Sequence, residues 1–168
     1  GKFAISARKK LVLLQAATAQ IDTVLTLPQA IAGMAVDKQQ RLWILTAGNN
    51  GGRLLALDSS LKRVKDWPLT NGAPAYLALD RGHRKAYWAA GDYIWQQSMR
   101  QDSLQAMQWL ALNSRNLYGM DVDPQTHEIY LSDALDFDQN AAIYRYDSLG
   151  NLLDQFEGGP LTNGFLFE

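Results

Sequence analysis

The chain has 168 residues, of which 47% are hydrophobic and 20% are charged, a balance typical of a globular domain with a substantial core. Because the formal net charge is -1 and the longest basic run is Arg8–Lys10, we do not expect nucleic acid to be the main partner. The complete lack of cysteine excludes disulfides, thiol catalysis and cysteine metal sites.

Alternating apolar and polar residues predict short β-strands along the whole chain. The first three predicted strands are Phe3–Ser6, Lys10–Leu14 and Gln20–Leu27. Three groups of four strands follow, and turn residues such as Asp, Gly, Asn and Pro separate the strands within each group. These groups cover residues 31–36, 42–45, 54–57 and 63–67; then 75–79, 86–89, 93–97 and 105–110; and then 117–122, 129–131, 143–146 and 152–156.

The groups repeat at a fixed interval. Each first strand ends on an aspartate, and 43 residues separate Asp37 from Asp80 and Asp80 from Asp123. A four-stranded unit of about 40–45 residues is typical of a β-propeller blade. We therefore predict an all-β fold, a single β-propeller domain over 1–168. Its blades are expected at about 1–28 plus 164–168, 29–70, 71–113 and 114–160.

Three aromatic residues hold equivalent places in the predicted second strands. They are Trp43, Tyr87 and Tyr130. Large aromatic side chains in such positions are expected to pack between adjacent blades.

The two ends of the chain predict how the ring closes. The first blade begins without its innermost strand, and Gly164–Glu168 matches Gly119–Asp123 position for position. The closing strand could pair with Phe3–Ser6 of its own chain, which gives a four-bladed ring. Alternatively, two chains could exchange closing strands and form an eight-bladed homodimer. A third interpretation is that the chain is the C-terminal part of a longer propeller.

The repeated aspartates are interpreted as turn residues, because Asp at such positions bonds its own backbone. His83 and His127 fall in the same turns and are expected to be solvated. The loop Ser132–Asn140 offers a different possibility, since Asp133, Asp136 and Asp138 could give oxygen ligands to calcium. The spacing does not match an EF-hand loop, so these three are weak candidates for a metal site.

In a propeller, the loops between second and third strands and between blades lie on one face. Here those loops are rich in Asn, Asp and Gly, which suits a polar, uncharged small ligand, although the same residues also favour loops for backbone reasons. Two tyrosines at the start of innermost strands could add apolar contact at the mouth of the channel. The predicted ligand-binding residues are Asn49, Asn50, Asn71, Tyr76, Asp92, Arg115, Asn116, Tyr118, Asp136 and Asp138.

The last full repeat carries a resemblance to a known family. The stretches Asp123–Thr126, Ile129–Ala134 and Ile143–Asp147 resemble a blade of the YncE-like, YVTN-repeat propellers. Residues 158–167 are similar to the closing strand of surface-layer-type members from the envelopes of Gram-negative anaerobes. Such proteins usually have seven or eight blades, whereas this chain has material for about four.

The resemblance implies a binding role in the cell envelope, in the periplasm or at the outer-membrane surface, and no catalysis. Members of the BtuG type bind cobalamin and pass it to an outer-membrane transporter, so cobalamin is a candidate ligand and such a transporter a candidate partner. A protein-interaction scaffold is the alternative function. A propeller enzyme, such as a lactonase or a quinoprotein-like dehydrogenase, is a third, although no histidine falls on the loop face.

Overall fold

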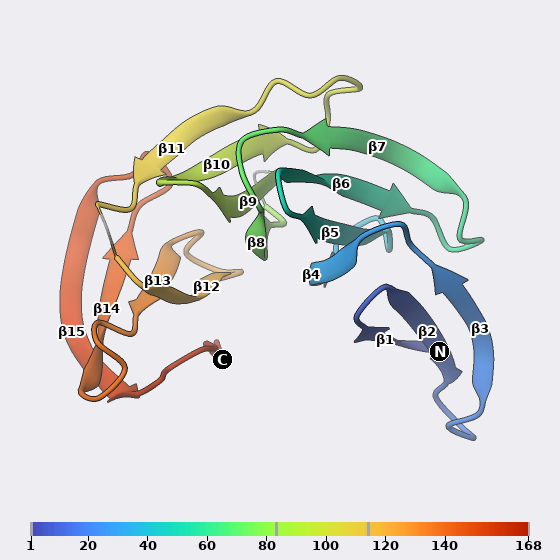
Figure 1. Ribbon diagram of the computed structural model, residues 1–168, viewed down its shortest axis with the longest axis horizontal. Coiled ribbons are helices and arrows are strands. Elements are labelled where there is room, and N and C mark those ends of the chain that lie inside the picture. Colours follow the sequence, from blue (N-terminus) through green and yellow to red (C-terminus); the bar gives the residue numbers. More distant parts are fainter. Residues whose placement is uncertain (1, 83, 114, 168) are drawn as a thin grey trace.

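The computed structural model describes residues 2–82, 84–113 and 115–167, which form an arc of antiparallel sheets placed side by side (Figure 1). His83 lies outside the described residues. Within the described ranges there is no helix long and apolar enough to cross a membrane.

Each sheet is built from consecutive strands, as expected from the short turns between the alternating segments. Blade 1 has three strands and blades 2, 3 and 4 have four each. Their bounds are β1 Lys2–Ala7, β2 Lys10–Gln15 and β3 Ile21–Thr26; β4 Ala30–Val36, β5 Leu42–Gly48, β6 Gly51–Leu57 and β7 Arg63–Leu69; β8 Ala75–Asp80, β9 Lys85–Ala90, β10 Tyr93–Ser98 and β11 Met107–Ala111; β12 Leu117–Val122, β13 Ile129–Asp133, β14 Asn140–Tyr146 and β15 Leu152–Pro160.

This arrangement confirms the predicted β-propeller of about four blades. The predicted strand bounds agree closely with the observed ones, and one difference has a local cause. The last strand of blade 3 begins at Met107 and not at Gln105, because the backbone N–H of Gln105 donates to the side-chain Oε1 of buried Gln97 (2.7 Å). That N–H is therefore not available to the sheet.

Closure of the ring within one chain is not what the structure shows. Among the described strands, β1 pairs only with β2, and blade 1 has no innermost strand. Residues 161–167 run along the inner side of blade 4, and Figure 1 shows the C-terminal end within the arc, away from β1. The packing between successive blades sets the curvature, and three such interfaces leave blade 1 and blade 4 apart.

The core lies between the blades. Leu11, Ile44 and Leu55 belong to the buried cluster between blades 1 and 2. The cluster between blades 2 and 3 contains three tryptophans, and the one between blades 3 and 4 joins Tyr87 to Ile129 and other apolar residues. Each sheet therefore buries the face that it turns to a neighbouring sheet, which removes apolar surface from water.

Two of the three equivalent aromatic residues lie between blades as predicted. Trp43 and Tyr87 are both completely buried, and the ring of Trp43 lies 5.5 Å from that of Trp67. The prediction for Tyr130 is wrong. Its face of blade 4 has no further blade against it, and its ring instead contacts Phe165 and Phe167 at 5.6 and 5.2 Å between centroids.

The turn role of the repeated aspartates is confirmed for Asp37 and Asp123. Asp37 accepts the backbone N–H groups of Gln39 and Arg41, and it also accepts Nε1 of Trp43 at 2.8 Å. Burial raises the pKa of the Asp37 carboxyl, but the hydrogen bonds from Trp43 and Arg41 outweigh this and hold it below the usual value. Asp123 accepts the backbone N–H of Gln125 at 2.7 Å.

The expectation that His127 is only a solvated turn residue is wrong. Its Nδ1 lies 2.9 Å from Oδ1 of Asp80, which is completely buried in the neighbouring blade, and its ring packs over Gly82. The side chain is 26% exposed. Because Asp80 ends the innermost strand of blade 3, this contact joins the ends of blades 3 and 4.

Replacing Trp43 with alanine should lower the free energy of unfolding by about 3–5 kcal/mol, since a large buried aromatic leaves a cavity between two blades. Urea denaturation measures this change. The matched control is Tyr130→Ala, which should cost less because no blade covers that position. Equal losses for the two variants would show that contacts between blades do not dominate stability.

Candidate ligand-binding site

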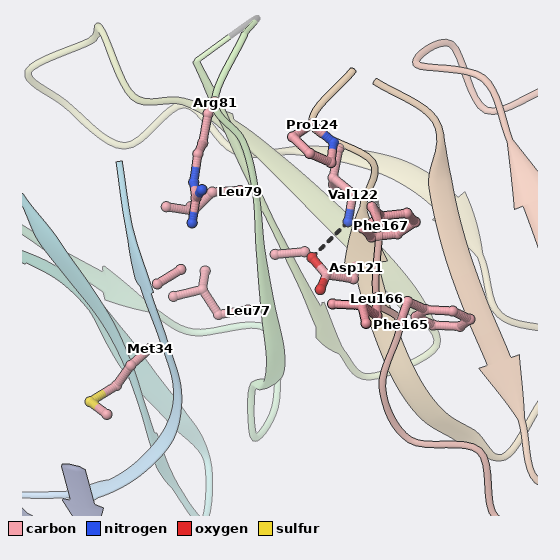
Figure 2. A pocket seen from close by; sticks show the side chains of 12 residues that line it. Met34, Leu77, Leu79, Arg81, Asp121, Val122, Pro124, Phe165, Leu166 and Phe167 are labelled. Atoms are coloured by element: carbon pink, nitrogen blue, oxygen red, sulfur yellow. Dashed lines mark hydrogen bonds between the residues drawn. The ribbon is translucent and has the colours of Figure 1, made fainter. Parts of the chain in front are cut away.

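The innermost strands β4, β8 and β12 line the concave side of the arc, where a pocket of about 360 Å³ lies. In a propeller this side faces the central channel. Most lining side chains are apolar, with one arginine and one aspartate among them (Figure 2). They are Met34, Ala35, Leu77, Ala78, Leu79, Arg81, Asp121, Val122, Pro124, Phe165, Leu166 and Phe167.

Small residues bring the innermost strands close together. A Cβ atom on Gly33 would lie 2.7 Å from the Cβ atom of Leu77, so any side chain at Gly33 would separate β4 from β8. Two residues beyond Gly33 is Ala35, and its equivalents 43 and 86 residues later are Ala78 and Asp121. All three line the pocket. Blade 4 therefore places a carboxyl group where the other two blades have a methyl group.

The carboxyl group of Asp121 is half-buried. Its Oδ1 accepts the backbone N–H of Val122 at 2.8 Å (Figure 2). Burial raises the pKa of Asp121 above its usual value, although the hydrogen bond from Val122 and the positive charge of Arg81 act in the opposite direction. A carboxyl group whose pKa is raised by burial in a pocket is a common property of functional sites.

Arg81 follows β8 directly and extends along the pocket wall (Figure 2). Its equivalents in the repeat are Lys38 and Pro124. The same three residues also line an adjoining pocket of about 390 Å³ at this end of the channel. Two cations therefore lie at this end, and Arg81 belongs to both pockets. A guanidinium group in this position can bind a carboxylate or phosphate in a bidentate manner.

The third wall comes from the C-terminal segment, residues 161–167. Phe165, Leu166 and Phe167 line the pocket, and the two phenylalanine rings are held by Tyr130. The hydroxyl of Ser132 donates to the backbone carbonyl of Thr162, which fixes the start of the segment on blade 4.

None of the ten ligand-binding residues predicted from the sequence lines this pocket. They lie at the opposite ends of the innermost strands and in the loops there. Asn49 and Asn50 are exposed in the β5–β6 turn of blade 2. Asn71 and Asp92 are both exposed. Their loops are neighbours, because the carbonyl oxygen of Asn71 lies 3.4 Å from the Cβ position of Gly91.

The structure does bring some of the other predicted residues together. Tyr76 Oη donates to the carbonyl oxygen of Leu117 at 2.8 Å, which joins the innermost strands of blades 3 and 4. Tyr76 also has a positive φ of 54°, an uncommon backbone conformation for a bulky residue. The ring of Tyr118 contacts Phe137, and Arg115 lies 4.2 Å above the ring of Tyr144.

Asn116 and the predicted calcium loop bond to one another. The side-chain amide of Asn116 donates to the carbonyl of Leu135, and its backbone N–H donates to Asp133 Oδ1 at 3.0 Å. Asp133 is buried and also accepts the N–H of Leu135. Asp136 accepts the N–H of Asp138 at 3.2 Å. Within the described ranges, no group of three or more His, Cys, Asp or Glu side chains could hold a metal ion.

Sequence reasoning did not identify Arg81 or Asp121. A signal for Asp121 exists, because it is a charged residue in an innermost strand whose equivalents are Ala35 and Ala78. Arg81 gives a weaker signal. It directly follows a turn aspartate, and a cation in an exposed turn is common without any role in binding.

No family model and no curated protein matches the sequence. Solved structures do match. A quinonprotein alcohol dehydrogenase-like protein from Bacteroides thetaiotaomicron matches with a TM-score of 0.70 and 14% identity, over 95% of this chain and 44% of that chain. A catalytically inactive virginiamycin B lyase from Staphylococcus aureus, in complex with quinupristin, matches with a TM-score of 0.68 and 14% identity, over 92% of this chain and 50% of that chain.

The structure of a nidogen/laminin complex matches with a TM-score of 0.68 and 19% identity, over 95% of this chain and 63% of that chain. At such identities the likeness concerns the fold alone. The dehydrogenase-like protein and the lyase are β-propeller proteins, which agrees with the fold described above. This chain spans about half the length of each of those two chains.

Replacing Asp121 with asparagine should stabilise the protein at neutral pH. Because burial raises the folded-state pKa of Asp121 above the usual value of 3.8, the folded protein holds this proton more tightly than the unfolded chain. The contribution of protonated Asp121 to the stability of the folded state is complete below pH 3.8 and is lost as the pH rises through the folded-state pKa. Asparagine has no such loss, and its side-chain oxygen can still accept the N–H of Val122.

Denaturant unfolding of both proteins across this pH range measures the difference. The gain from Asp121→Asn should shrink as the pH falls and vanish below 3.8. The control is Asp58→Asn, because hydrogen bonds led by that from Ser60 lower the pKa of Asp58 and the variant should gain nothing at neutral pH. A wild type that equals or exceeds Asp121→Asn in stability at neutral pH would contradict the raised pKa.

Proposed function

We propose that this propeller domain binds a compact small molecule in the pocket of the central channel, with Arg81 and Asp121 as its polar contacts. The observation that carries the proposal is that these two side chains face one pocket whose other lining side chains are apolar. A few convergent polar groups on an apolar wall are typical of small-molecule sites, and a volume of about 360 Å³ is in the lower part of their usual range.

The chemistry of the wall suggests the class of ligand. Arg81 suits a carboxylate or phosphate, and Asp121 can donate a hydrogen bond when protonated or accept one when ionised. Leu77, Phe165 and Phe167 offer apolar contact to the rest of the molecule. The site therefore favours an anion with a small apolar body. This differs from the uncharged ligand expected from the loop face.

We infer a binding role and not catalysis. No serine, histidine, cysteine or lysine is among the residues that line the pocket, so the wall offers no obvious nucleophile besides the carboxyl group of Asp121. One carboxyl group and one guanidinium group are sufficient to orient a ligand. This part of the proposal is tested by the fate of a bound compound, which should be recovered unchanged.

The resemblance to YncE-like propellers adds further proposals about ligand and location. It suggests cobalamin as a ligand, the cell envelope as the location and an outer-membrane transporter as a partner. A compact pocket does not by itself favour a corrinoid over smaller molecules. Cobalamin is therefore included as a probe in the experiment below.

Isothermal titration calorimetry with phenylacetate, its neutral analogue phenylacetamide and cyanocobalamin tests the site. Phenylacetate should bind more tightly than phenylacetamide. Arg81→Ala should weaken phenylacetate binding by at least about 10-fold, because a hydrogen bond to a charged group contributes about 1.5–3 kcal/mol. Arg100→Ala is the matched control, since Arg100 is exposed and lies outside the pocket.

Two results would contradict the proposal. One is an equal effect of Arg81→Ala and Arg100→Ala on phenylacetate. The other is binding of any of the three probes that survives Arg81→Ala but is lost in the double variant Asn116→Ala with Asp138→Ala. That second result would place the site on the loop face, where the sequence predicted it.

A further inference from the structure

The connection between the third and fourth strands is longer in blade 3 than in blade 4. It covers residues 99–106 in blade 3 and residues 147–151 in blade 4. Both connections contact a tryptophan of the preceding blade. Nε1 of Trp67 donates to the carbonyl oxygen of Asp102 at 3.1 Å, and Nε1 of Trp109 donates to that of Ser148 at 3.3 Å. The two junctions between blades are therefore built alike up to this contact.

The difference in length appears two residues before each tryptophan. Lys65 reaches the longer connection, where its Nζ donates to the carbonyl oxygen of Gln101 at 2.7 Å, and its side chain is only 12% exposed. Met107 holds the equivalent place in blade 3 and is 60% exposed, since the shorter turn of blade 4 leaves it uncovered.

Beside Met107 lies a second pocket, of about 460 Å³. Side chains two positions apart on a strand share a face, so Lys85 lies on the face of Tyr87, and Gln96 on the face of Ile94. Tyr87 and Ile94 belong to the cluster between blades 3 and 4. The pocket therefore lies on the side of blade 3 that is turned to blade 4. The described residues that line it are Lys85, Gln96, Ser98, Gln101, Gln105, Ala106 and Met107.

Two polar groups of this wall have no partner within the described ranges. Oε1 of Gln96 is buried and accepts no hydrogen bond there, which is unfavourable and uncommon in native proteins. The ammonium group of Lys85 likewise has no hydrogen bond or ion pair with a described residue. Because a terminal amide rotates easily about its last side-chain bond, a donor on a bound molecule can reach the oxygen of Gln96.

A network of amides holds the longer connection in place. Gln97 is 1% exposed, and its Oε1 accepts the backbone N–H of Gln105 at 2.7 Å. Its Nε2 donates to Oε1 of Gln101 at 3.0 Å, and Nε2 of Gln101 donates to Oε1 of Gln105 at 2.7 Å. The amide oxygen of Gln105 is therefore occupied, while its NH₂ group is left to donate.

We propose that this second pocket binds an N-acylated amino acid with an apolar side chain. Lys85 and the NH₂ group of Gln105 donate to the carboxylate, which is the strong, charge-assisted contact. Oε1 of Gln96 accepts the amide N–H of the ligand. The apolar side chain lies against Met107 and Ala106.

The surroundings favour a ligand with an apolar part over a purely polar one. Met107 is not the only exposed apolar side chain near Trp109. Leu149 is 80% exposed and lies between Ser148, which accepts the bond from Trp109, and Gly150, whose Cβ position is 3.3 Å from the carbonyl oxygen of Trp109. Neighbouring exposed apolar side chains mark a contact surface.

This inference does not rest on the proposed function, because no residue lines both this pocket and the channel pocket. The two sites also differ in their cation, which is Lys85 here and Arg81 in the channel. Variants of these two residues therefore test the sites separately.

Isothermal titration calorimetry with N-acetyl-leucine and the neutral N-acetyl-leucinamide tests the second pocket. The wild type should bind the carboxylate at least about 10-fold more tightly, because an ionised partner strengthens the bond from Lys85. Lys85→Met removes the charge and should make the two affinities nearly equal. Lys62→Met is the matched control, since Lys62 is exposed and lies outside the pocket, and it should keep the preference.

Gln96→Leu tests the second contact. It should weaken binding of both probes several-fold and by the same factor, since each carries the amide N–H. The thermal midpoint should not fall, because the substitution removes a buried oxygen that has no partner among the described residues. Arg81→Ala should leave the affinity for N-acetyl-leucine unchanged.

Three results would overturn the inference. The first is no binding of N-acetyl-leucine to the wild type at millimolar concentration. The second is a preference for the carboxylate that survives Lys85→Met. The third is binding that is lost in Arg81→Ala but not in Lys85→Met, which would place the compound in the channel pocket.

Discussion

The packing of one blade against the next is the interaction on which the rest of the structure depends. No sheet here has a core of its own. Trp43 and Trp67 of blade 2 face blade 3, while Tyr87 and Trp109 of blade 3 face blade 4. A sheet with two apolar faces must cover both. The interior blades do so within the chain, whereas the first and last blades each leave one face uncovered, most clearly at Phe3.

Polar contacts between blades restrain how one blade is oriented on the next. Lys65 of blade 2 bonds Asp102 of blade 3 at 2.5 Å, and buried Asp80 of blade 3 contacts His127 of blade 4. The Asp102 side chain of the first pair is fully exposed, so water screens this pair and it contributes little to stability. The second is at the channel end of the blades, close in sequence to Arg81. Contacts that hold neighbouring innermost strands in place therefore also hold the walls of the pocket.

The channel and the loop face differ in what their polar side chains are free to do. On the loop face, Asn116 and Asp133 satisfy backbone groups of their own loops, which is the ordinary role of such residues. In the channel, Asp121 bonds a single backbone N–H and faces an apolar wall, and burial makes its charge unfavourable. A polar group kept at a cost to stability is a stronger indication of a binding site than a polar loop.

The sequence by itself determined the local features. The 43-residue interval, the period-two strands and the turn aspartates predicted the blades, because strand alternation and turn chemistry depend on neighbours in the chain. It also predicted the burial of Trp43 and Tyr87. Only the tertiary structure decided that the ring is open, that Tyr130 contacts the C-terminal segment, and that Arg81 and Asp121 share a pocket. These features depend on the angle between blades and on contacts between residues 35 or more positions apart, which no local pattern encodes.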